Sequence, residues 1–206
     1  MKEPPPLILA SASPRRAHLL TQLGLEFRVQ PSHIPEDLLP GEGPDAHAER
    51  LSRAKAGEIW EGNREALVVA GDTVVVLDGD ILGKPADTEE AVRMLGSLAG
   101  RTHRVVSGLA LAFPGGALHS GTTTTDVTFR TFDEELARSY AATGEPMDKA
   151  GAYGIQGFGS ALVTEIKGDY NTVVGLPIPL LLELFLAGGF RYEFGALVPL
   201  PKESSR

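Results

Sequence analysis

A run of branched apolar residues at positions 66–82, ALVVAGDTVVVLDGDIL, constrains the fold more than any other stretch. Valine-rich segments favour β-strands, and the Asp-Gly pair at 78–79 is a strong signal for a tight hairpin turn. A two-residue loop would place Thr73 opposite Lys84, whereas a bulged three-residue loop would place Asp72 opposite Lys84. We favour the bulged form because it gives the strand carboxylate a cationic neighbour. Either register is expected to bring Lys84 near the same strand end.

Helix and strand signals alternate along the rest of the chain. We predict helices over residues 14–23, 45–60, 88–98, 132–143 and near the C-terminus, with Ser13, Asp45 and Asp87 as caps. We predict further strands over residues 7–10, 26–30, 103–113, 122–132 and 161–166, and a loop over 167–177. Strands outnumber a simple β-α alternation, and hairpins accompany helical crossovers. This order predicts an α/β protein with α+β character, in which one domain of residues 1–206 is built on a mixed sheet.

Composition excludes several classes of function. The chain has no cysteine, which rules out disulfides, thiolate zinc sites and cysteine nucleophiles. Its net charge of −8 argues against a nucleic-acid partner, because such a partner needs a basic surface. The apolar runs are too short for a membrane helix, and the N-terminal residues do not resemble a secretion signal. We therefore expect a soluble, cytoplasmic protein with neither a nucleic-acid nor a membrane partner.

Two arginines stand where a helix disfavours them. In LILASASPRRAHLLTQLGL, residues 7–25, a strand leads through a polar elbow into a helix capped by Ser13. Arg15 and Arg16 then lie in the first turn, where the helix dipole makes each unfavourable by up to about 1 kcal/mol. A phosphate would compensate, since the elbow offers free N–H groups, the hydroxyls of Ser11 and Ser13, and two guanidiniums. The alternative is that both arginines point into solvent or pair with acidic residues.

The SASPRR elbow and its leucine-rich helix resemble the opening of the Maf family of nucleoside triphosphate pyrophosphatases. Four further segments match that family in order: RAKA at Arg53–Ala56, AGDTVVV at Ala70–Val76, GKP at Gly83–Pro85 and KAGAYGIQG at Lys149–Gly157. The resemblance implies an elongated mixed sheet flanked by helices, similar to inosine triphosphate pyrophosphatase-like folds. It also implies two lobes, with the active site in the cleft between them.

Asp72 interrupts the valine-rich strand, and a charge in such a run is costly unless it is paired or functional. From the residues alone, a carboxylate hydrogen-bonded at a strand end remains an alternative. The resemblance implies that Asp72 is the catalytic acid-base residue, acting with Mg²⁺ or Mn²⁺, and that Glu36 and Lys55 are functional. Read alone, Glu36 would be a solvated loop charge and Lys55 a surface charge. We predict Asp72, Glu36, Lys55 and Lys84 as catalytic residues, with Asp72 and Glu36 also binding the metal.

A glycine-rich segment, KAGAYGIQGFGS at residues 149–160, has one side-chain amide, Gln156. Such backbone can approach a ligand closely or adopt positive φ, while the interleaved apolar residues argue for a packed loop. An amide both donates and accepts, which suits the N3–H and O4 edge of uracil or thymine. The resemblance implies that Thr73 and Gln156, with Arg15, place the chain in the branch that acts on dTTP and UTP.

Together these features predict a pyrophosphatase that hydrolyses dTTP and UTP, or modified pyrimidine triphosphates, to the monophosphate and pyrophosphate. The predicted substrate-binding residues are Ser11, Ser13, Arg15, Arg16, Thr73 and Gln156. One alternative is a 7-methyl-GTP pyrophosphatase of the same family. Another is a nucleotide-binding regulator of cell division that needs no turnover. A homodimer is implied by the resemblance alone.

Overall fold

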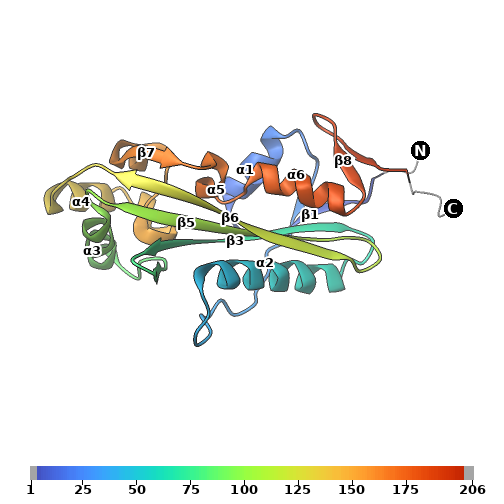
Figure 1. Cartoon of the computed structure of the whole chain (residues 1–206), viewed down its shortest axis with the longest axis horizontal. Coiled ribbons are helices and arrows are strands. Elements are labelled where there is room, and N and C mark those ends of the chain that lie inside the picture. The colour runs from blue at the N-terminus through green and yellow to red at the C-terminus, as the bar shows by residue number, and fades with distance from the viewer. Residues whose placement is uncertain (1–3, 202–206) are drawn as a thin grey trace. The chain divides into compact units, whose positions relative to one another are not determined.

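The computed structural model describes residues 4–201 of the 206-residue chain (Figure 1). The strands are β1 (Leu7–Leu9), β2 (Arg28–Val29), β3 (Leu67–Leu77), β4 (Asp80–Leu82), β5 (Thr102–Ala112), β6 (Leu118–Phe129), β7 (Val163–Lys167), β8 (Phe190–Tyr192) and β9 (Leu197–Pro199). The α-helices are α1 (Pro14–Gln22), α2 (Pro44–Glu61), α3 (Thr88–Leu98), α4 (Glu134–Ala141), α5 (Tyr170–Val174) and α6 (Ile178–Ala187). Three 3₁₀ turns lie between α4 and β7: η1 (Glu145–Asp148), η2 (Ala150–Ala152) and η3 (Gly157–Leu162).

The chain forms two compact units. Unit 1 comprises residues 4–72, 108–122 and 175–201, and unit 2 comprises residues 73–107 and 123–174. Strands β3, β5 and β6 contribute residues to both units. Within residues 4–201, no helix has the length and apolar character needed to cross a membrane.

The main sheet is mixed, as predicted. Its strand order is β2-β1-β3-β5-β6-β7, with β4 paired to β3 off this path. Strand β1 runs parallel to β2 and β3, whereas β3 and β4, and also β6 and β7, pair antiparallel. The α/β fold class with α+β character is therefore confirmed. Two features were not predicted: the short β8–β9 hairpin and helix α5, which lies inside the segment expected to be a loop.

Two of the three predicted helix caps are confirmed. The Ser13 and Asp87 side chains accept the N–H groups of Arg16 and Glu90, at 3.4 and 2.7 Å. The Asp45 prediction was wrong. Helix α2 begins one residue earlier, after Gly43, and no side chain caps it. Proline at the first helical position explains the earlier start, because its fixed φ suits a helix and its missing N–H costs nothing there.

In unit 1, α2 covers one side of the sheet, while α1 and α6 lie on the other (Figure 1). The core beneath α2 is built largely from small side chains: Ile8, Ala10, Ala56, Ile59, Ala66, Val68, Ala70, Ala110 and Ala112. Gly108 on β5 marks the closest approach, since a Cβ built there would lie 2.3 Å from the Ala48 carbonyl oxygen of α2. Small residues in the strands thus let the helix backbone lie directly on the sheet.

The preferred register of the β3–β4 hairpin was wrong. Val75 pairs with Leu82, and Leu77 pairs with Asp80, which leaves a two-residue loop at 78–79. Both loop residues have positive φ, 54° and 97°, as a type I′ turn requires. The bulged form was favoured only because it gave Asp72 a cation. In the folded protein that cation comes from α2, so the hairpin keeps the turn that its Asp-Gly pair prefers.

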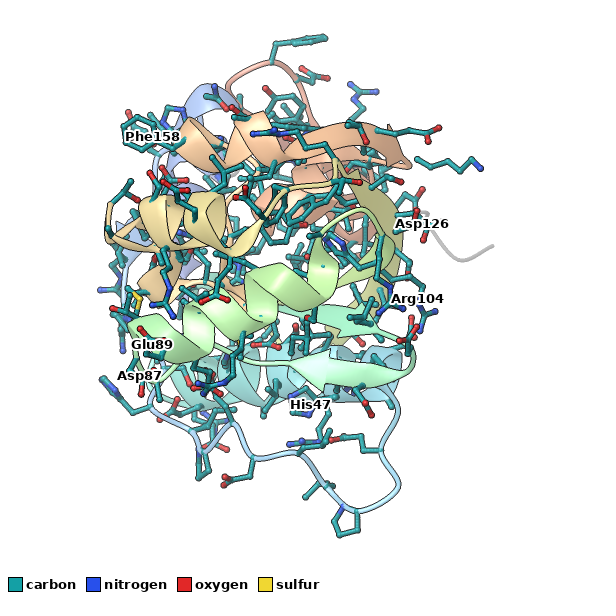
Figure 2. The ribbon with its side chains drawn as sticks, turned by 90° about the vertical axis from the view of Figure 1, so that its left-hand side faces the viewer. His47, Asp87, Glu89, Arg104, Asp126 and Phe158 are labelled. Carbon is teal, nitrogen blue, oxygen red and sulfur yellow. The ribbon has the colours of Figure 1, made fainter. Side chains whose placement is uncertain are left out.

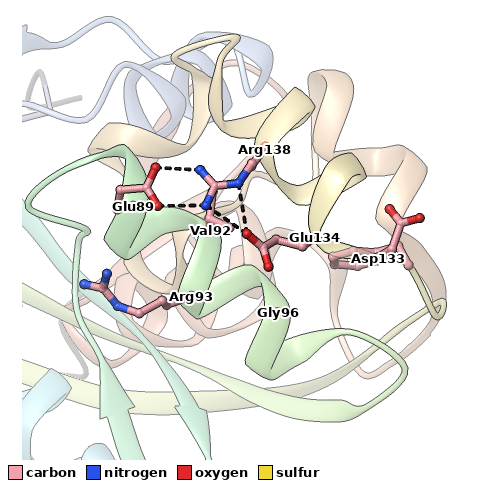
Figure 3. Close-up of a pocket in the computed structure, with 8 residues that line it drawn as sticks. Glu89, Val92, Arg93, Gly96, Asp133, Glu134 and Arg138 are labelled. Atoms are coloured by element: carbon pink, nitrogen blue, oxygen red, sulfur yellow. Dashed lines mark hydrogen bonds and ion pairs between the residues drawn. The ribbon is translucent and has the colours of Figure 1, made fainter.

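In unit 2, α3 and α4 lie side by side (Figure 1) and are joined by one arginine. Arg138 of α4 donates to both carboxylate oxygens of Glu89 on α3, at 2.6 and 2.9 Å, and to Glu134 at 2.8 Å (Figure 3). The hydrogen bonds from Arg138 hold the pKa of Glu89 below its ordinary value. These groups border a surface pocket that contains none of the predicted site residues. We interpret the pairing as support for the helix pair.

Candidate functional site

Three of the predicted catalytic residues meet at one ammonium group in unit 1. Lys55 Nζ donates to Asp72 Oδ1 at 2.7 Å and lies 2.7 Å from Glu36 Oε1. Asp72 and Lys55 are 8% and 7% exposed, whereas the Glu36 side chain is about half exposed. The charge inside the valine-rich strand is therefore paired, as its cost requires.

Lys55 reaches Asp72 because it lies on the buried face of α2. The buried residues of this helix recur at helical spacing: His47, Ala48, Leu51, Ser52, Lys55, Ala56 and Ile59. A lysine inside such a stripe points toward the sheet. The residues alone suggested a surface charge at this position, and its place in the apolar stripe was the signal that could have corrected that interpretation.

Arg16 is held beside this group by fixed acceptors of unit 1. Its Nε donates to the Gly175 carbonyl oxygen at 2.7 Å, and its Nη1 donates to Ser11 Oγ at 3.0 Å. A Cβ at Gly71, the residue before Asp72, would lie 3.2 Å from Arg16 Nε. Burial lowers the pKa of Arg16, while the nearby charge of Asp72 opposes that shift. The guanidinium therefore lies next to strand β3 rather than in open solvent.

The hydroxyls of the elbow are used to shape it. Ser11 Oγ accepts the Ser13 N–H at 3.2 Å as well as the Arg16 guanidinium, and Ser13 Oγ caps α1. Ser11 is buried and Ser13 is half-buried. Both oxygens act as acceptors in these contacts, so each O–H can donate to an anion. Arg15, in the same first turn, is half-buried.

The loop that carries Glu36 is tied to α2 at two places that sequence reasoning missed. Glu58 of α2 accepts the Ser32 hydroxyl and, at 3.2 Å, the His33 N–H. Arg50 of α2 donates to the Asp37 carbonyl oxygen at 2.9 Å and to both carboxylate oxygens of Glu42. The hydrogen bonds from Arg50, with those from His47 and the Leu39 N–H, hold the pKa of Glu42 at about 2. Helix α2 thus positions both Lys55 and the backbone around Glu36.

The remaining predicted residues belong to unit 2. Thr73 Oγ1 lies 2.8 Å from Ser107 Oγ, whose hydroxyl donates to the Thr172 carbonyl oxygen at 2.7 Å. Asp169, to which the sequence gave no role, accepts the N–H and hydroxyl of Thr172 and so caps α5. The GKP segment and the glycine-rich segment meet, because the Gly151 N–H donates to the Gly83 carbonyl oxygen at 3.0 Å. Lys84 is exposed and Gln156 is half-buried.

Comparison with known proteins identifies the family of the chain. The profile of a protein family described as "Maf-like protein" matches residues 6–187. The chain belongs to the Maf-like family. A relative from Moorella thermoacetica named dTTP/UTP pyrophosphatase is 49% identical over 187 residues, covering 89% of this chain and 95% of the relative. A relative of the same name from Thermococcus kodakarensis is 48% identical over 179 residues, covering 86% and 94%.

The fold of this Maf-like chain also resembles a solved structure, the Ham1 protein of Staphylococcus aureus. The TM-score is 0.51 at 16% identity, covering 88% of this chain and 98% of the other. At this low sequence identity, the similarity supports a shared fold and nothing further. It agrees with the mixed α/β architecture that the sequence predicted.

The glycine-rich segment of this Maf-like chain is packed, as its apolar residues suggested. Residues 151–155 are buried. Gly151 has a φ of 68°, and a Cβ there would lie 2.8–2.9 Å from the side chain of Val75 on β3. The glycines are therefore required by contacts within the protein itself.

Asp72 and Glu36 are the two residues that the sequence predicts to bind a metal. Among residues 4–201, no three His, Asp or Glu side chains gather closely enough to hold an ion on their own. Asp72 and Glu36 nevertheless reach one common point, the Lys55 ammonium, and both supply hard oxygen ligands. Mg²⁺ is commonly held by one or two carboxylates together with substrate phosphates. The donor set therefore fits a cation that arrives with a phosphorylated ligand.

Proposed function

We propose that this chain hydrolyses dTTP and UTP to the nucleoside monophosphate and pyrophosphate. The observation that carries the proposal is the Lys55 ammonium shared by Asp72 and Glu36, with Arg16 beside the same strand. Membership of the Maf-like family supports it, as do the names of the Moorella and Thermococcus relatives.

The phosphate groups would be held by local positive charge. A chain with a net charge of −8 repels a triphosphate unless cations are gathered at the site. We assign this role to Arg15, Arg16, Lys55 and Lys84, with the hydroxyls of Ser11 and Ser13 as additional donors. Lys55 can exchange a carboxylate for a phosphate oxygen without losing an ionic partner. Its contacts therefore support a site prepared for an anion.

In the proposed reaction, water attacks the α-phosphorus and the bond to the α,β-bridging oxygen breaks, so that pyrophosphate leaves. Asp72 accepts the proton of the attacking water, and Lys55 next to it stabilises the ionised carboxylate that this role needs. Glu36 and Asp72 would hold Mg²⁺ or Mn²⁺. When bound, such a cation neutralises phosphate charge and acidifies water.

Base selection would rest on unit 2. Gln156 offers a donor and an acceptor on one amide, which matches the N3–H and O4 edge of uracil and thymine. Thr73 is positioned through Ser107. Thr73 and Gln156, with Arg15, are therefore the specificity residues of the proposal.

Pyrophosphate release from a panel of triphosphates tests the function. The panel contains dTTP, UTP, CTP, GTP, 7-methyl-GTP and modified pyrimidine triphosphates, each with and without Mg²⁺. We expect turnover of dTTP and UTP that depends on the metal, and a loss of that preference in Gln156→Ala. Preference for 7-methyl-GTP would overturn the substrate assignment. No turnover of any triphosphate would favour a nucleotide-binding regulator, whose cellular effect should then survive Asp72→Asn.

A further inference from the structure

Gln156 lies in a loop of unit 2 whose first and last residues are close together. A Cβ at Gly159 would lie 2.2 Å from the Gly154 carbonyl oxygen, so the two ends of residues 154–159 touch. Gln156 lies near the middle of this closed loop and is half-buried. Its amide makes no hydrogen bond to the protein among residues 4–201. The position of the amide is therefore set by the backbone of the loop.

Both ends of the loop are bound by one pair of side chains, the buried Tyr140 on α4 and the half-buried Glu145 on η1. The Tyr140 hydroxyl accepts the Gly154 N–H at 3.1 Å and donates to Glu145 Oε1 at 2.8 Å. Glu145 accepts the Gly159 N–H at 3.1 Å on Oε1 and the Phe158 N–H at 3.0 Å on Oε2. Three backbone N–H groups flanking Gln156 thus converge on two side chains. We call Tyr140 and Glu145 the loop clamp.

After Gln156, the loop is held through its backbone, by the hydrogen bonds to Glu145. Phe158 is 70% exposed and projects outward (Figure 2), although its N–H is fixed by Glu145. A Cβ at Gly157 would lie 2.5 Å from Glu145 Oε2, and one at Gly159 would lie 2.5 Å from the Tyr140 hydroxyl. Gly157 and Gly159 therefore make room for the clamp. Although burial alone would raise it, the hydrogen bonds from Gly159, Tyr140 and Phe158 hold the pKa of Glu145 below its ordinary value.

We propose that Tyr140 and Glu145 are positioning residues for base selection, because they fix the loop backbone that presents Gln156. The proposal rests on the proposed function, in which Gln156 reads the uracil or thymine edge. A clamp of this kind acts on how well the correct base is held and leaves the phosphate chemistry of unit 1 unchanged. Its loss should therefore raise KM for dTTP and UTP while kcat stays close to wild type.

Two conservative variants test the clamp. Tyr140→Phe removes the acceptor for Gly154 N–H, and Glu145→Gln leaves one oxygen where two accepted three hydrogen bonds. We expect each to lower kcat/KM for UTP by about tenfold, because a backbone N–H group of the loop loses its acceptor, with CTP and GTP unaffected. Glu135→Gln, an exposed position of α4 with the same loss of charge, is the matched control and should keep wild-type selectivity.

A double-mutant cycle shows whether the effect passes through Gln156. In the Gln156→Ala background, Tyr140→Phe should no longer change the UTP-to-CTP selectivity. Amide hydrogen exchange gives a readout independent of substrate: Gly154 should exchange faster in Tyr140→Phe, and Phe158 or Gly159 in Glu145→Gln. Faster exchange with unchanged selectivity would overturn the positioning role and leave the proposed function intact. A wild-type protein that shows no dTTP or UTP preference would instead overturn the proposed function, and with it the role given to the clamp.

Discussion

The site in unit 1 and the loop in unit 2 hold their charged side chains in different ways. In unit 1, Lys55 is bound by two other side chains, Asp72 and Glu36. In unit 2, Glu145 is bound by two backbone N–H groups and a tyrosine hydroxyl. Side chains can exchange partners by rotating, whereas backbone N–H groups are fixed by the course of the chain.

This difference suggests how the two regions divide the work. In the proposed function, Lys55 turns from a carboxylate to a phosphate oxygen while the fold stays intact. In unit 2, the hydrogen bonds from Phe158 and Gly159 to Glu145 cannot break without a movement of the loop backbone. On this proposal, Lys55, which responds to a ligand, is held by side chains. Glu145, which fixes the course of the loop, is held largely by backbone N–H groups.

The largest effect is expected at Asp72. Asp72→Asn keeps the size of the side chain but removes the base, so kcat should fall by about 10²–10⁴-fold in a pyrophosphate-release assay. Asp37→Asn, an exposed acid beside Glu36, is the control and should retain near-normal turnover. Near-normal turnover in Asp72→Asn itself would remove Asp72 from the mechanism.

The unfolding free energies of Lys55 and Asp72 variants show whether the two charges stabilise each other. Lys55→Met leaves Asp72 buried without its cation, which should lower the free energy of unfolding by about 3 kcal/mol. Adding Asp72→Asn should recover part of that loss, because the uncompensated charge is gone. Lys167→Met, at an exposed lysine of β7, should have little effect in the same urea titration. Additive losses in the double variant would contradict the pairing.

The close contact between α2 and β5 gives a smaller effect that separates packing from charge. Gly108→Ala must push the Ala48 carbonyl of α2 away, which should cost about 2 kcal/mol and reduce turnover by shifting Lys55. Gly57→Ala changes the same helix where no atom lies within 4 Å of the new Cβ, so it should stabilise by about 0.5–1 kcal/mol. Equal stability of the two variants would show that α2 is not held as closely as described.

Much of the fold follows from local patterns, and the misses have physical causes. The Asp78-Gly79 turn and the Asp87 cap are decided by a few neighbouring residues, so the sequence alone identifies them. The β8–β9 hairpin was missed because its strands are three residues each, too short to show a period. The register error at Asp72 came from seeking its cation on the next strand, when α2 supplies it from 17 residues away.

The sequence identified which residues make up the candidate site better than it identified the residues they contact. A charge in a valine-rich strand identified Asp72, and unfavourable arginines at a helix start identified Arg16. The partner of Arg16, the Gly175 carbonyl, lies 159 residues further along the chain, and no local pattern indicates it. Glu145 was missed for a similar reason, because a glutamate before a glycine-rich loop reads as a solvated charge until the loop folds back onto it.

An effect that depends on pH concerns His103 in unit 2, a buried titratable group that forms no ion pair within residues 4–201. It is 2% exposed, its Nε2 lies 2.8 Å from the Tyr153 hydroxyl, and its ring packs edge-on to Phe129. Desolvation by burial lowers its pKa from 6.5 to about 4. Between these values the unfolded chain binds a proton that the native protein does not, so stability should fall as pH drops below about 6.5.

The His103 contribution should reach about 2 kcal/mol at pH 5, measured by urea unfolding at a series of pH values. His103→Gln cannot titrate and should lose this part of the pH dependence, whatever its stability at pH 7. His18→Gln, at an exposed histidine, should keep it. An unchanged slope between pH 7 and 5 in His103→Gln would place the titrating group elsewhere.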